Sequence, residues 1–338
     1  MNFNKILFVG HKKDLNSPDN GLVYYSFYES LKNISKDLKP FFYEDYKNEE
    51  RDYSLIELHK NYKPDIIIYV YQFGKLDFKT LLKLKDSNSV TVNFYGDDVW
   101  RFNSFTLKTY HLFDVVVSFD ESKKVEYNIN RIYNVIFSQW AGISRFKVKK
   151  LSKEFDHEIS FIGAKTEYRE WIIRELKNNG INVVCFGKGW DKGIIHYDEM
   201  KRINSRSRIS LDLPNSISYD IRYLIKYPIG IYRILKNFFN KKLKEEDGIK
   251  ARIFEVTSMG GLLITYYNST ISNYFKIGEE IYCYNSLNDL VRLVKKTLNE
   301  PVESEKVRLN GYNRSVKDHL YENRMKKILE DLKIYGRK

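Results

Sequence analysis

The sequence predicts an α/β protein with two domains, each built around a parallel sheet. Short apolar runs bounded by turn residues alternate with longer segments of helical periodicity, which is the pattern of βα units. A polar, charged connector at residues 150–158 interrupts this rhythm and divides the chain into two series of similar size. A length of 338 residues and a hydrophobic content of 43% are sufficient for two separate cores.

Composition and charge restrict the class of protein without selecting a partner. The chain has 57 Lys and Arg against 44 Asp and Glu, and the net charge of +13 favours nucleotides, phospholipid surfaces or nucleic acid as partners. Cys185 and Cys283 are too few for a disulfide framework and suggest a reducing cytoplasm. The first apolar run, at residues 6–9, is too short for a signal sequence or a membrane span. We therefore expect a cytoplasmic protein.

The first half of the chain contains five expected strands. They are the apolar runs at residues 6–9, 65–71, 90–95, 115–119 and 135–137. Helices are expected between them, at residues 22–35, 55–61 and 78–85. Together these elements predict an N-terminal parallel-sheet domain over residues 1–150.

The second half repeats the pattern over residues 151–310. Its strands are expected at residues 159–163, 183–186, 209–213, 262–265 and 281–284. Residues 311–338 are expected to form a C-terminal helix that packs back toward the N-terminal domain. Because ligands of parallel sheets bind at the carboxyl ends of the strands, the ends of these strands are where a ligand is expected.

An insertion at residues 217–246 breaks this alternation. Within residues 219–242, basic residues alternate with aromatic and aliphatic ones at helical spacing, which is typical of a helix on an anionic membrane interface. The alternative is an ordinary amphipathic helix packed on the second domain with its lysines in water. Pro228 and Gly230 should divide the segment into two short pieces.

The most informative stretch is a charged helix over residues 250–259 that runs into a Gly-Gly turn. Glu255 lies among apolar neighbours, where a carboxylate needs a partner. A ribose would supply one, because an ionised carboxylate only accepts hydrogen bonds and the sugar diol offers two donors. Arg252 lies on the same helical face and could bind a phosphate. The alternative is that Glu255 simply pairs with Arg252 or a lysine.

A second candidate feature lies at the start of the second domain. Gly163 ends a strand, and residues 165–169 open a helix whose free N–H groups and positive dipole end favour an anion. A diphosphate could bind there, with Lys165 or Arg169 neutralising its charge.

A third feature follows the next strand. Gly187 and Gly189 would allow a ligand to approach the backbone closely, and Trp190 could stack on a base. The alternative is a turn in which the tryptophan is packed.

The first domain offers candidate catalytic groups at two strand ends. Asp97 and Asp98 are adjacent, and because two neighbouring carboxylates cannot both be buried cheaply, one could have a raised pKa and act on an acceptor hydroxyl. The alternative is that Asp98 caps the following helix while Asp97 stays solvated. His11, just past the first strand, is a further candidate base.

Four motifs in the C-terminal half share their order and spacing with a known family. They are Arg-Ile-Phe-Glu at residues 252–255, Met-Gly-Gly-Leu-Leu-Ile-Thr at 259–265, Tyr-Phe-Lys-Ile-Gly-Glu-Glu at 274–280 with Tyr284, and His-Leu-Tyr-Glu-Asn-Arg at 319–324. Over residues 159–330 this pattern resembles the glycosyltransferase-like family typified by spore maturation protein CgeB.

The resemblance implies the GT-B architecture, with two Rossmann-like domains facing each other across a crevice and the nucleotide-sugar held mainly by the second. It implies that Glu255 is the ribose-binding carboxylate and that Gly260 and Gly261 belong to the nucleotide-sugar site. Many retaining GT-B enzymes have another Glu eight positions earlier, where this chain has Asp247.

We therefore expect a glycosyltransferase that moves a sugar from a nucleotide-sugar, with a UDP-sugar favoured, to a hydroxyl of a glycan, lipid-linked or protein acceptor for the cell surface. It would act in the cytoplasm or peripherally on the inner face of the membrane, with no nucleic-acid partner. No separate cofactor or metal is expected, since the chain has no Asp-x-Asp and its histidines lack metal-ligand spacing. The alternatives are a nucleotide-sugar epimerase on the same fold and a non-catalytic nucleic-acid-binding or membrane-binding protein.

Overall fold

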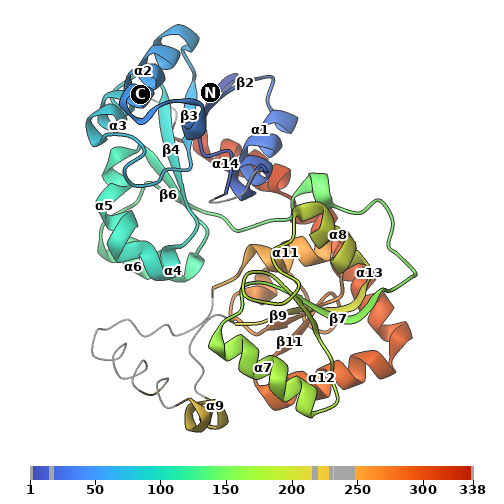
Figure 1. The fold of residues 1–338 in the computed structure, drawn as a ribbon. Helices are drawn as coiled ribbons and strands as arrows, with labels where there is room; N and C mark the ends of the chain where they lie inside the picture. The colour runs from blue at the N-terminus through green and yellow to red at the C-terminus, as the bar shows by residue number, and fades with distance from the viewer. Residues whose placement is uncertain (1–2, 15–18, 215–219, 228–230, 232–247, 336–338) are drawn as a thin grey trace. The chain divides into compact units, whose positions relative to one another are not determined.

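The chain divides into two units. The computed structural model describes residues 3–14, 19–214, 220–227, 231 and 248–335 (Figure 1). One unit consists of Met1–Arg145 together with Leu320–Lys338, and the other of Phe146–His319. A short 3₁₀ helix, η7 (Ser144–Phe146), lies where the chain first passes from one unit to the other, a few residues before the connector expected at 150–158.

The first unit is built on a six-stranded parallel sheet with the strand order β2-β1-β3-β4-β5-β6. Five of its strands confirm the sequence prediction, and the edge strand β2 was not predicted. The strands are β1 (Lys5–Gly10), β2 (Asp37–Phe42), β3 (Ile66–Tyr69), β4 (Val90–Tyr95), β5 (Val115–Ser118) and β6 (Val135–Phe137). Pro40 is tolerated in β2 because an edge strand can lack one backbone donor.

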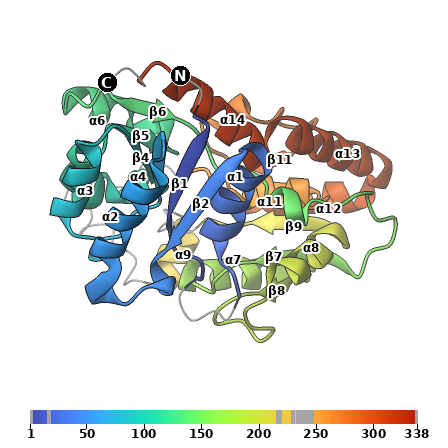
Figure 2. The ribbon, with the colours of Figure 1, turned by 90° about the horizontal axis from the view of Figure 1, so that it is seen from above.

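Helices cover both faces of this sheet. On one face, α14 (Tyr321–Leu332) packs beside α1 (Glu29–Ile34), as Figures 1 and 2 show. The helix predicted at 22–35 is observed as one continuous helical run over residues 22–34, in which a π-helical segment, η1 (Tyr24–Tyr28), leads into α1. The remaining helices of the unit are η2 (Tyr43–Asp45), η3 (Asn48–Glu50), α2 (Arg51–Tyr62), α3 (Phe78–Lys85), α4 (Asp98–Arg101), η4 (Phe102–Thr106), α5 (Leu107–Thr109), η5 (Tyr110–Leu112), η6 (Glu121–Lys123) and α6 (Lys124–Ile129).

The second unit is built on a five-stranded parallel sheet with the strand order β11-β10-β9-β7-β8. All five strands confirm the prediction. They are β7 (His157–Ile162), β8 (Val184–Phe186), β9 (Ser207–Asp212), β10 (Leu263–Tyr266) and β11 (Tyr282–Tyr284).

Figure 1 shows α7 and α12 on one face of this second sheet and α8, α11 and α13 on the other. The helices of the unit are α7 (Glu167–Asn178), α8 (Tyr197–Ser205), α9 (Ile221–Lys226), α11 (Ala251–Ser258), η8 (Ile271–Asn273), α12 (Leu287–Asn299) and α13 (Pro301–Asp318). Its core packs Trp171 and Leu176 of α7 and Leu290 of α12 against the apolar residues of the strands. The periodic apolar positions of α7 and α12 therefore meet the apolar runs of the strands in this core, while Ile203 of α8 packs with Ile162 and Phe186 in a second cluster.

The start of the predicted insertion packs on the second unit. Tyr223 of α9 is buried against Trp171, and its hydroxyl donates to Glu167 Oε1 at 2.8 Å. Ile221 and Ile225, one helical turn apart, are 70% and 74% exposed. Most of the insertion, and Asp247 just after it, lie outside the described residues.

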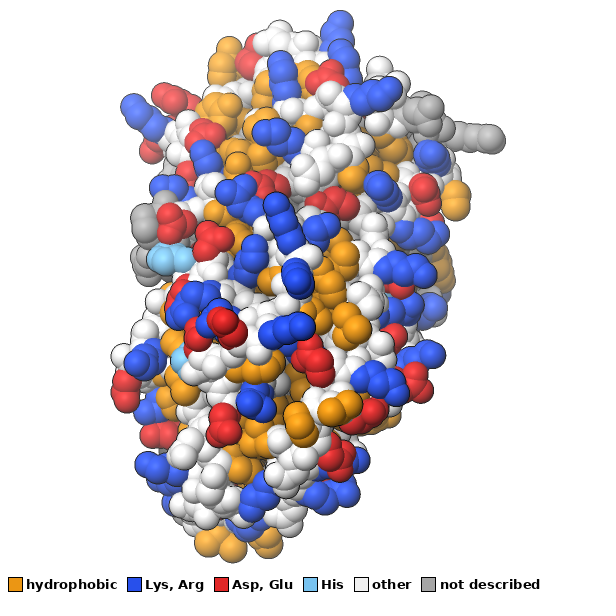
Figure 3. Space-filling model, turned by 90° about the vertical axis from the view of Figure 1, so that its right-hand side faces the viewer, with side chains coloured by type: hydrophobic (Ala, Val, Ile, Leu, Met, Phe, Trp, Pro, Cys, Tyr) orange, Lys and Arg blue, Asp and Glu red, His pale blue; other side chains and the backbone are white. Residues whose placement is uncertain are grey.

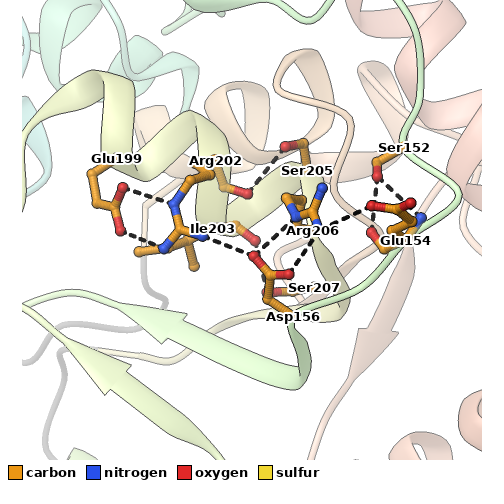
Figure 4. Close-up of polar contacts among 9 residues, drawn as sticks. All are labelled: Ser152, Glu154, Asp156, Glu199, Arg202, Ile203, Ser205, Arg206 and Ser207. Carbon is orange, nitrogen blue, oxygen red and sulfur yellow. Dashed lines mark hydrogen bonds and ion pairs between the residues drawn. The ribbon is translucent and has the colours of Figure 1, made fainter.

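A charged network connects the amino ends of β7 and β9 (Figure 4). Asp156 lies between two guanidinium groups, accepting from Arg202 Nη1 at 2.8 Å and from Nε and Nη2 of Arg206 at 2.9 Å each. The same arginines also pair with Glu199 and Glu154. The hydrogen bonds from Arg206 hold the pKa of Asp156 below its usual value. Because the network is solvent-exposed, it orients these side chains but adds little to the free energy of unfolding.

The surface carries both signs of charge. On the face shown in Figure 3, lysine and arginine side chains are spread over the surface with aspartate and glutamate among them. Within the described ranges, no helix is both long enough and apolar enough to cross a bilayer.

Candidate active site

Polar and glycine residues of the second unit gather at the carboxyl edge of its sheet. Gly163 follows β7 and Gly187 follows β8, and these two strands pair through Ile162 and Phe186. Asp212 is the last residue of β9 and pairs with Thr265 of β10. Helix α11 begins beside this edge, because Lys250 Nζ donates to the carbonyl oxygen of Leu213 at 3.1 Å. The edge is where ligands of parallel sheets bind.

The turn at Gly163 is built by close backbone approach. Gly187 has a φ of +122°, and a Cβ atom at this position would lie 2.4 Å from the carbonyl oxygen of Gly163. Trp190 Nε1 donates to the same oxygen at 2.9 Å, and its ring packs edge-on against Phe161. Gly187 and Trp190 therefore shape the turn, and in this structure the indole N–H serves the turn itself.

Lys165 and Gly189 lie at the same turn. A Cβ atom on Gly189, whose φ is +88°, would lie 3.0 Å from Lys165 Cβ. The ammonium group of Lys165 lies 5.4 Å from the centre of the Trp190 ring and 3.1 Å from Glu170 Oε1. Lys165 is thus a partly exposed cation at the turn with a weak surface partner.

Arg252 lies directly over Gly163. A Cβ atom on Gly163 would be only 2.8 Å from Arg252 Nη2, so glycine is needed for the guanidinium to take this place. Arg252 Nη1 donates to Asp212 Oδ1 at 2.8 Å, and Lys250 Nζ lies 3.6 Å from Asp212 Oδ2. Asp212 is only 2% exposed. Asp212 was not predicted from the sequence. Its position, as an acidic residue at the end of an apolar strand, could have indicated that it belongs to a site.

Arg169 is part of this edge but its donors serve the backbone. The residue is buried, and its Nη1 and Nη2 donate to the carbonyl oxygens of Ala164 and Leu213 at 2.9 Å each. These bonds join the start of α7 to the end of β9. Arg169 adds positive charge to the edge, and a direct bond from it to a diphosphate stays a prediction.

Glu255 lies one turn inside α11 and is 6% exposed. Burial raises the pKa of its carboxyl to about 7, against the opposing charge of Arg252. In the part of the chain that the structure describes, no hydrogen bond or ion pair engages this carboxyl group. The sequence reading left open a pair between Glu255 and Arg252, but Arg252 pairs with Asp212 instead.

Gly260 and Gly261 are not brought to this site. They precede β10, at the amino end of the strand, whereas Gly163 follows the carboxyl end of β7. Gly260 has a φ of +79°, and a Cβ atom there would meet Val148 at 2.9 Å. A Cβ atom on Gly261 would meet Val256 at 2.8 Å. These glycines allow the tight turn from α11 into β10, and their nucleotide role has no geometric support.

The first unit has a pocket of about 660 Å³, part of it open to solvent, at the carboxyl ends of β1, β3 and β4. Its polar side chains come from His11, Gln72, Asp97, Asp98, Arg101 and Trp140. Its walls are mainly apolar and aromatic: Leu22, Val23, Phe27, Val70, Tyr71, Phe94, Tyr95 and Phe105. A Cβ atom on Gly96 would lie 2.6 Å from the Trp140 ring, so this glycine lets the ring close one side. Gln72, Arg101 and Trp140 were not predicted.

The two adjacent aspartates of this pocket have different environments. Asp97 is exposed, whereas Asp98 is 1% exposed and accepts from the hydroxyls of Thr106 and Ser118 at 2.5 Å and of Tyr127 at 2.7 Å. Burial raises the pKa of Asp98, although the three hydroxyls oppose the shift. Its hydrogen bonds join α4 to η4, β5 and α6, so of the pair only Asp97 is exposed at the pocket.

His11 follows β1 and lines the same pocket. Its Nδ1 atom is shielded from solvent and has no hydrogen-bond partner among the described residues. Burial lowers the pKa of the imidazole, although Glu44 and Asp14 oppose the shift. His11 is therefore neutral near pH 7, which is the form that can accept a proton.

A metal site is not evident in the described ranges, where no three His, Cys, Asp or Glu residues are grouped closely enough to hold an ion.

The architecture of the two sheets is that of the GT-B glycosyltransferases. Sucrose-phosphate synthase from Thermosynechococcus elongatus aligns with a TM-score of 0.64 at 10% identity, covering 98% of this chain and 99% of that chain. Anabaena HepE in complex with UDP-glucose aligns with a TM-score of 0.59 at 9% identity, with coverages of 98% and 99%. Identities this low establish the fold alone.

TarM of S. aureus, solved with fondaparinux, α-GlcNAc-glycerol and UDP, aligns with a TM-score of 0.54 at 13% identity. The alignment covers 85% of this chain and 58% of TarM.

The sequence was also compared with models of protein families. Residues 167–330, a range that contains Arg252 and Glu255, match the family model described as glycosyl transferase-like. No match is found among curated protein sequences. Membership of the CgeB-like family stays a prediction.

The environment of Glu255 predicts how stability depends on pH. Its pKa is 4.5 in an exposed chain and about 7 in the fold, so the folded state loses stability as pH rises from about 4.5 to about 7. Glu255→Gln removes this titration. The ligand-free variant is expected to exceed the wild type in free energy of unfolding by on the order of 1–3 kcal/mol at pH 8, and by little near pH 4.5. Urea unfolding across this pH range measures the difference.

Glu279→Gln is the matched control, because Glu279 is an exposed glutamate of the same unit. Its unfolding curves should follow those of the wild type at each pH. Parallel pH profiles for Glu255→Gln and the wild type would contradict the assignment of a raised pKa to Glu255.

Proposed function

We propose that this protein transfers a sugar from a nucleotide-sugar to an acceptor hydroxyl. The observation that carries the proposal is Glu255, a buried carboxyl group with no bonded partner among the described residues, three residues after Arg252, whose guanidinium lies over Gly163. A ribose offers two hydroxyl donors to such a carboxylate, and a diphosphate complements the turn. The donor would therefore bind at the carboxyl edge of the second sheet.

The charges at this edge suit a departing nucleoside diphosphate. Lys250, Arg252 and Arg169 all act on the buried carboxylate of Asp212, so three cations lie close together near Gly163. Cations placed where negative charge develops stabilise a transition state without reorganising. Transfer would then consist of bringing donor and acceptor together while these groups stabilise the diphosphate as it leaves.

The acceptor would bind in the pocket of the first unit. Aromatic walls can cover the apolar face of a sugar ring, and Gln72, Arg101 and Asp97 can bind its hydroxyls. His11 or Asp97 would remove the proton of the attacking hydroxyl, because both are in the pocket and neither is engaged as Asp98 is.

The comparisons support a glycosyltransferase activity in general, without specifying the donor or the acceptor. The family model that matches residues 167–330 describes glycosyltransferase-like proteins, and the solved structures of HepE and TarM contain UDP. They favour UDP-sugars as the first donors to test.

The function is tested by nucleotide binding. Thermal shifts are expected with UDP, GDP or their sugar conjugates, because a ligand that binds only the folded state raises the melting temperature. Glu255→Gln should weaken the affinity for the preferred nucleotide by on the order of 1.5–3 kcal/mol, the range for a hydrogen bond to a charged group. Titration calorimetry measures this loss.

Unchanged nucleotide affinity in a folded Glu255→Gln protein would remove the ribose assignment. Incubating the preferred nucleotide-sugar without an acceptor separates the alternatives, because an epimerase would interconvert the sugar. Failure of all nucleotides to bind would favour a non-catalytic role.

The acceptor pocket is tested by turnover. Asp97→Asn and His11→Gln are each expected to lower turnover with little change in donor affinity, by about 10²-fold or more for the residue that acts as base. Asp98→Asn is the matched comparison, since it should mainly lower the free energy of unfolding, by on the order of 1–3 kcal/mol. Steady-state kinetics and urea unfolding of the three variants measure both effects. Full turnover in both Asp97→Asn and His11→Gln would place the base elsewhere.

We further propose that the acceptor is a cell-surface glycan or glycoconjugate reached at an anionic membrane. The basic and apolar composition of residues 219–242 supports this, as do the exposed Ile221 and Ile225 beside Lys226 on α9. Co-sedimentation with anionic vesicles is expected at low salt and should weaken at high salt, because the Debye length shrinks. Neutral vesicles are the control. Absence of binding to anionic vesicles at low salt would reject the membrane role.

A further inference from the structure

A buried carboxylate lies at the edge of the second sheet where the diphosphate is proposed to bind. Asp212 is 2% exposed and ends β9, next to the turn at Gly163 where the diphosphate is proposed to bind. By charge alone it should repel that anion. A buried negative charge next to a diphosphate is unfavourable unless it also makes a contact that improves binding of the diphosphate.

Asp212 is itself held from several directions. Thr265 Oγ1 donates to Asp212 Oδ2 at 3.0 Å, and Tyr284 donates its hydroxyl to the backbone carbonyl of Asp212 at 3.1 Å. Burial opposes ionisation, but Lys250, Arg252, Arg169 and the Thr265 hydroxyl together lower the pKa of Asp212. The carboxylate is therefore ionised and fixed at neutral pH.

This fixed carboxylate determines where Arg252 lies. An arginine side chain has many rotamers, and ordering it costs up to about 2 kcal/mol of entropy. The bond from Arg252 Nη1 to Asp212 orders the side chain before any ligand binds, and Nη2 of the same planar group is left over Gly163. Pre-ordering of this kind increases affinity because less freedom is lost on binding.

We propose that Asp212 is a positioning residue for the donor diphosphate, which holds the guanidinium of Arg252 over the Gly163 turn. The inference rests on the proposed function, since it assumes that a nucleoside diphosphate binds this edge. It extends that function by assigning to an acidic residue a favourable effect on binding an anion.

The experiment compares variants of the full chain for binding of UDP and uridine, or GDP and guanosine if GDP is preferred. Asp212→Asn keeps the size of the side chain and removes its charge. It is expected to weaken diphosphate binding about tenfold, which is the effect of losing one well-oriented charged contact, and to leave nucleoside binding nearly unchanged. Calorimetry measures both affinities, and thermal unfolding confirms the fold.

Asp156→Asn is the matched control. Asp156 is also paired with two arginines in the same unit, but at the amino edge of the sheet, so its removal changes the net charge equally. Its diphosphate affinity should equal that of the wild type. If Asp212→Asn does not fold, Thr265→Val is the second variant, because it keeps every charge and removes only the hydroxyl that orients Asp212; about threefold weaker diphosphate binding is then expected.

A double-mutant cycle separates positioning from general structural support. If Asp212 acts through Arg252, Asp212→Asn should have little further effect on diphosphate affinity in an Arg252→Ala background. Stronger diphosphate binding in Asp212→Asn would show that the carboxylate only repels the ligand, and equal losses for diphosphate and nucleoside would show general damage. Either result would overturn the proposal while leaving the donor site in place. Failure of the wild type to bind any nucleoside diphosphate would instead defeat the proposed function.

Discussion

The ion pair between Asp212 and Arg252 is the interaction on which the candidate donor site depends. It joins the end of β9 to the start of α11, and Thr265 of β10 adds a third element to the same carboxylate. A guanidinium can lie over Gly163 only because that position has no Cβ atom and because the carboxylate holds the other end of the group. The glycine turn, the position of the Arg252 guanidinium and the orientation of α11 therefore depend on one another.

Asp98 in the first unit shows how a buried carboxylate behaves when its partners are neutral. Three hydroxyls donate to it, no cation of the described ranges is bonded to it, and burial raises its pKa. Around Asp212 the cations outweigh burial and lower the pKa. The partners therefore decide the role: hydroxyls make Asp98 a junction of the fold, whereas cations make Asp212 part of an electrostatic site.

The fold class was predictable because strands buried on both faces of a parallel sheet give continuous apolar runs. The unpredicted strand β2 lies at an edge, and its Asp37, Lys39 and Pro40 hide the apolar pattern. Helical spacing placed Arg252 and Glu255 on one face. It could not reveal that Arg252 pairs with Asp212, 40 residues away, because only the register of the sheet brings them together. The predicted order of helix, Gly-Gly turn and strand already placed Gly260 and Gly261 at the amino end of β10, so only the family resemblance assigned them to the nucleotide-sugar site.

The engagement of Arg252 also explains the state of Glu255. Arg252 lies three residues before Glu255 and would be its natural partner on an isolated helix. In the fold its Nη1 is bonded to Asp212, so the guanidinium lowers the pKa of Glu255 too weakly to overcome burial, and the pKa rises to about 7. A buried carboxyl group without a protein partner is costly, and such departures from good local packing are concentrated at functional sites. Because Asp212 holds the guanidinium of Arg252, the carboxyl group of Glu255 has no bonded partner among the described residues, and this is the observation from which the ribose contact is proposed.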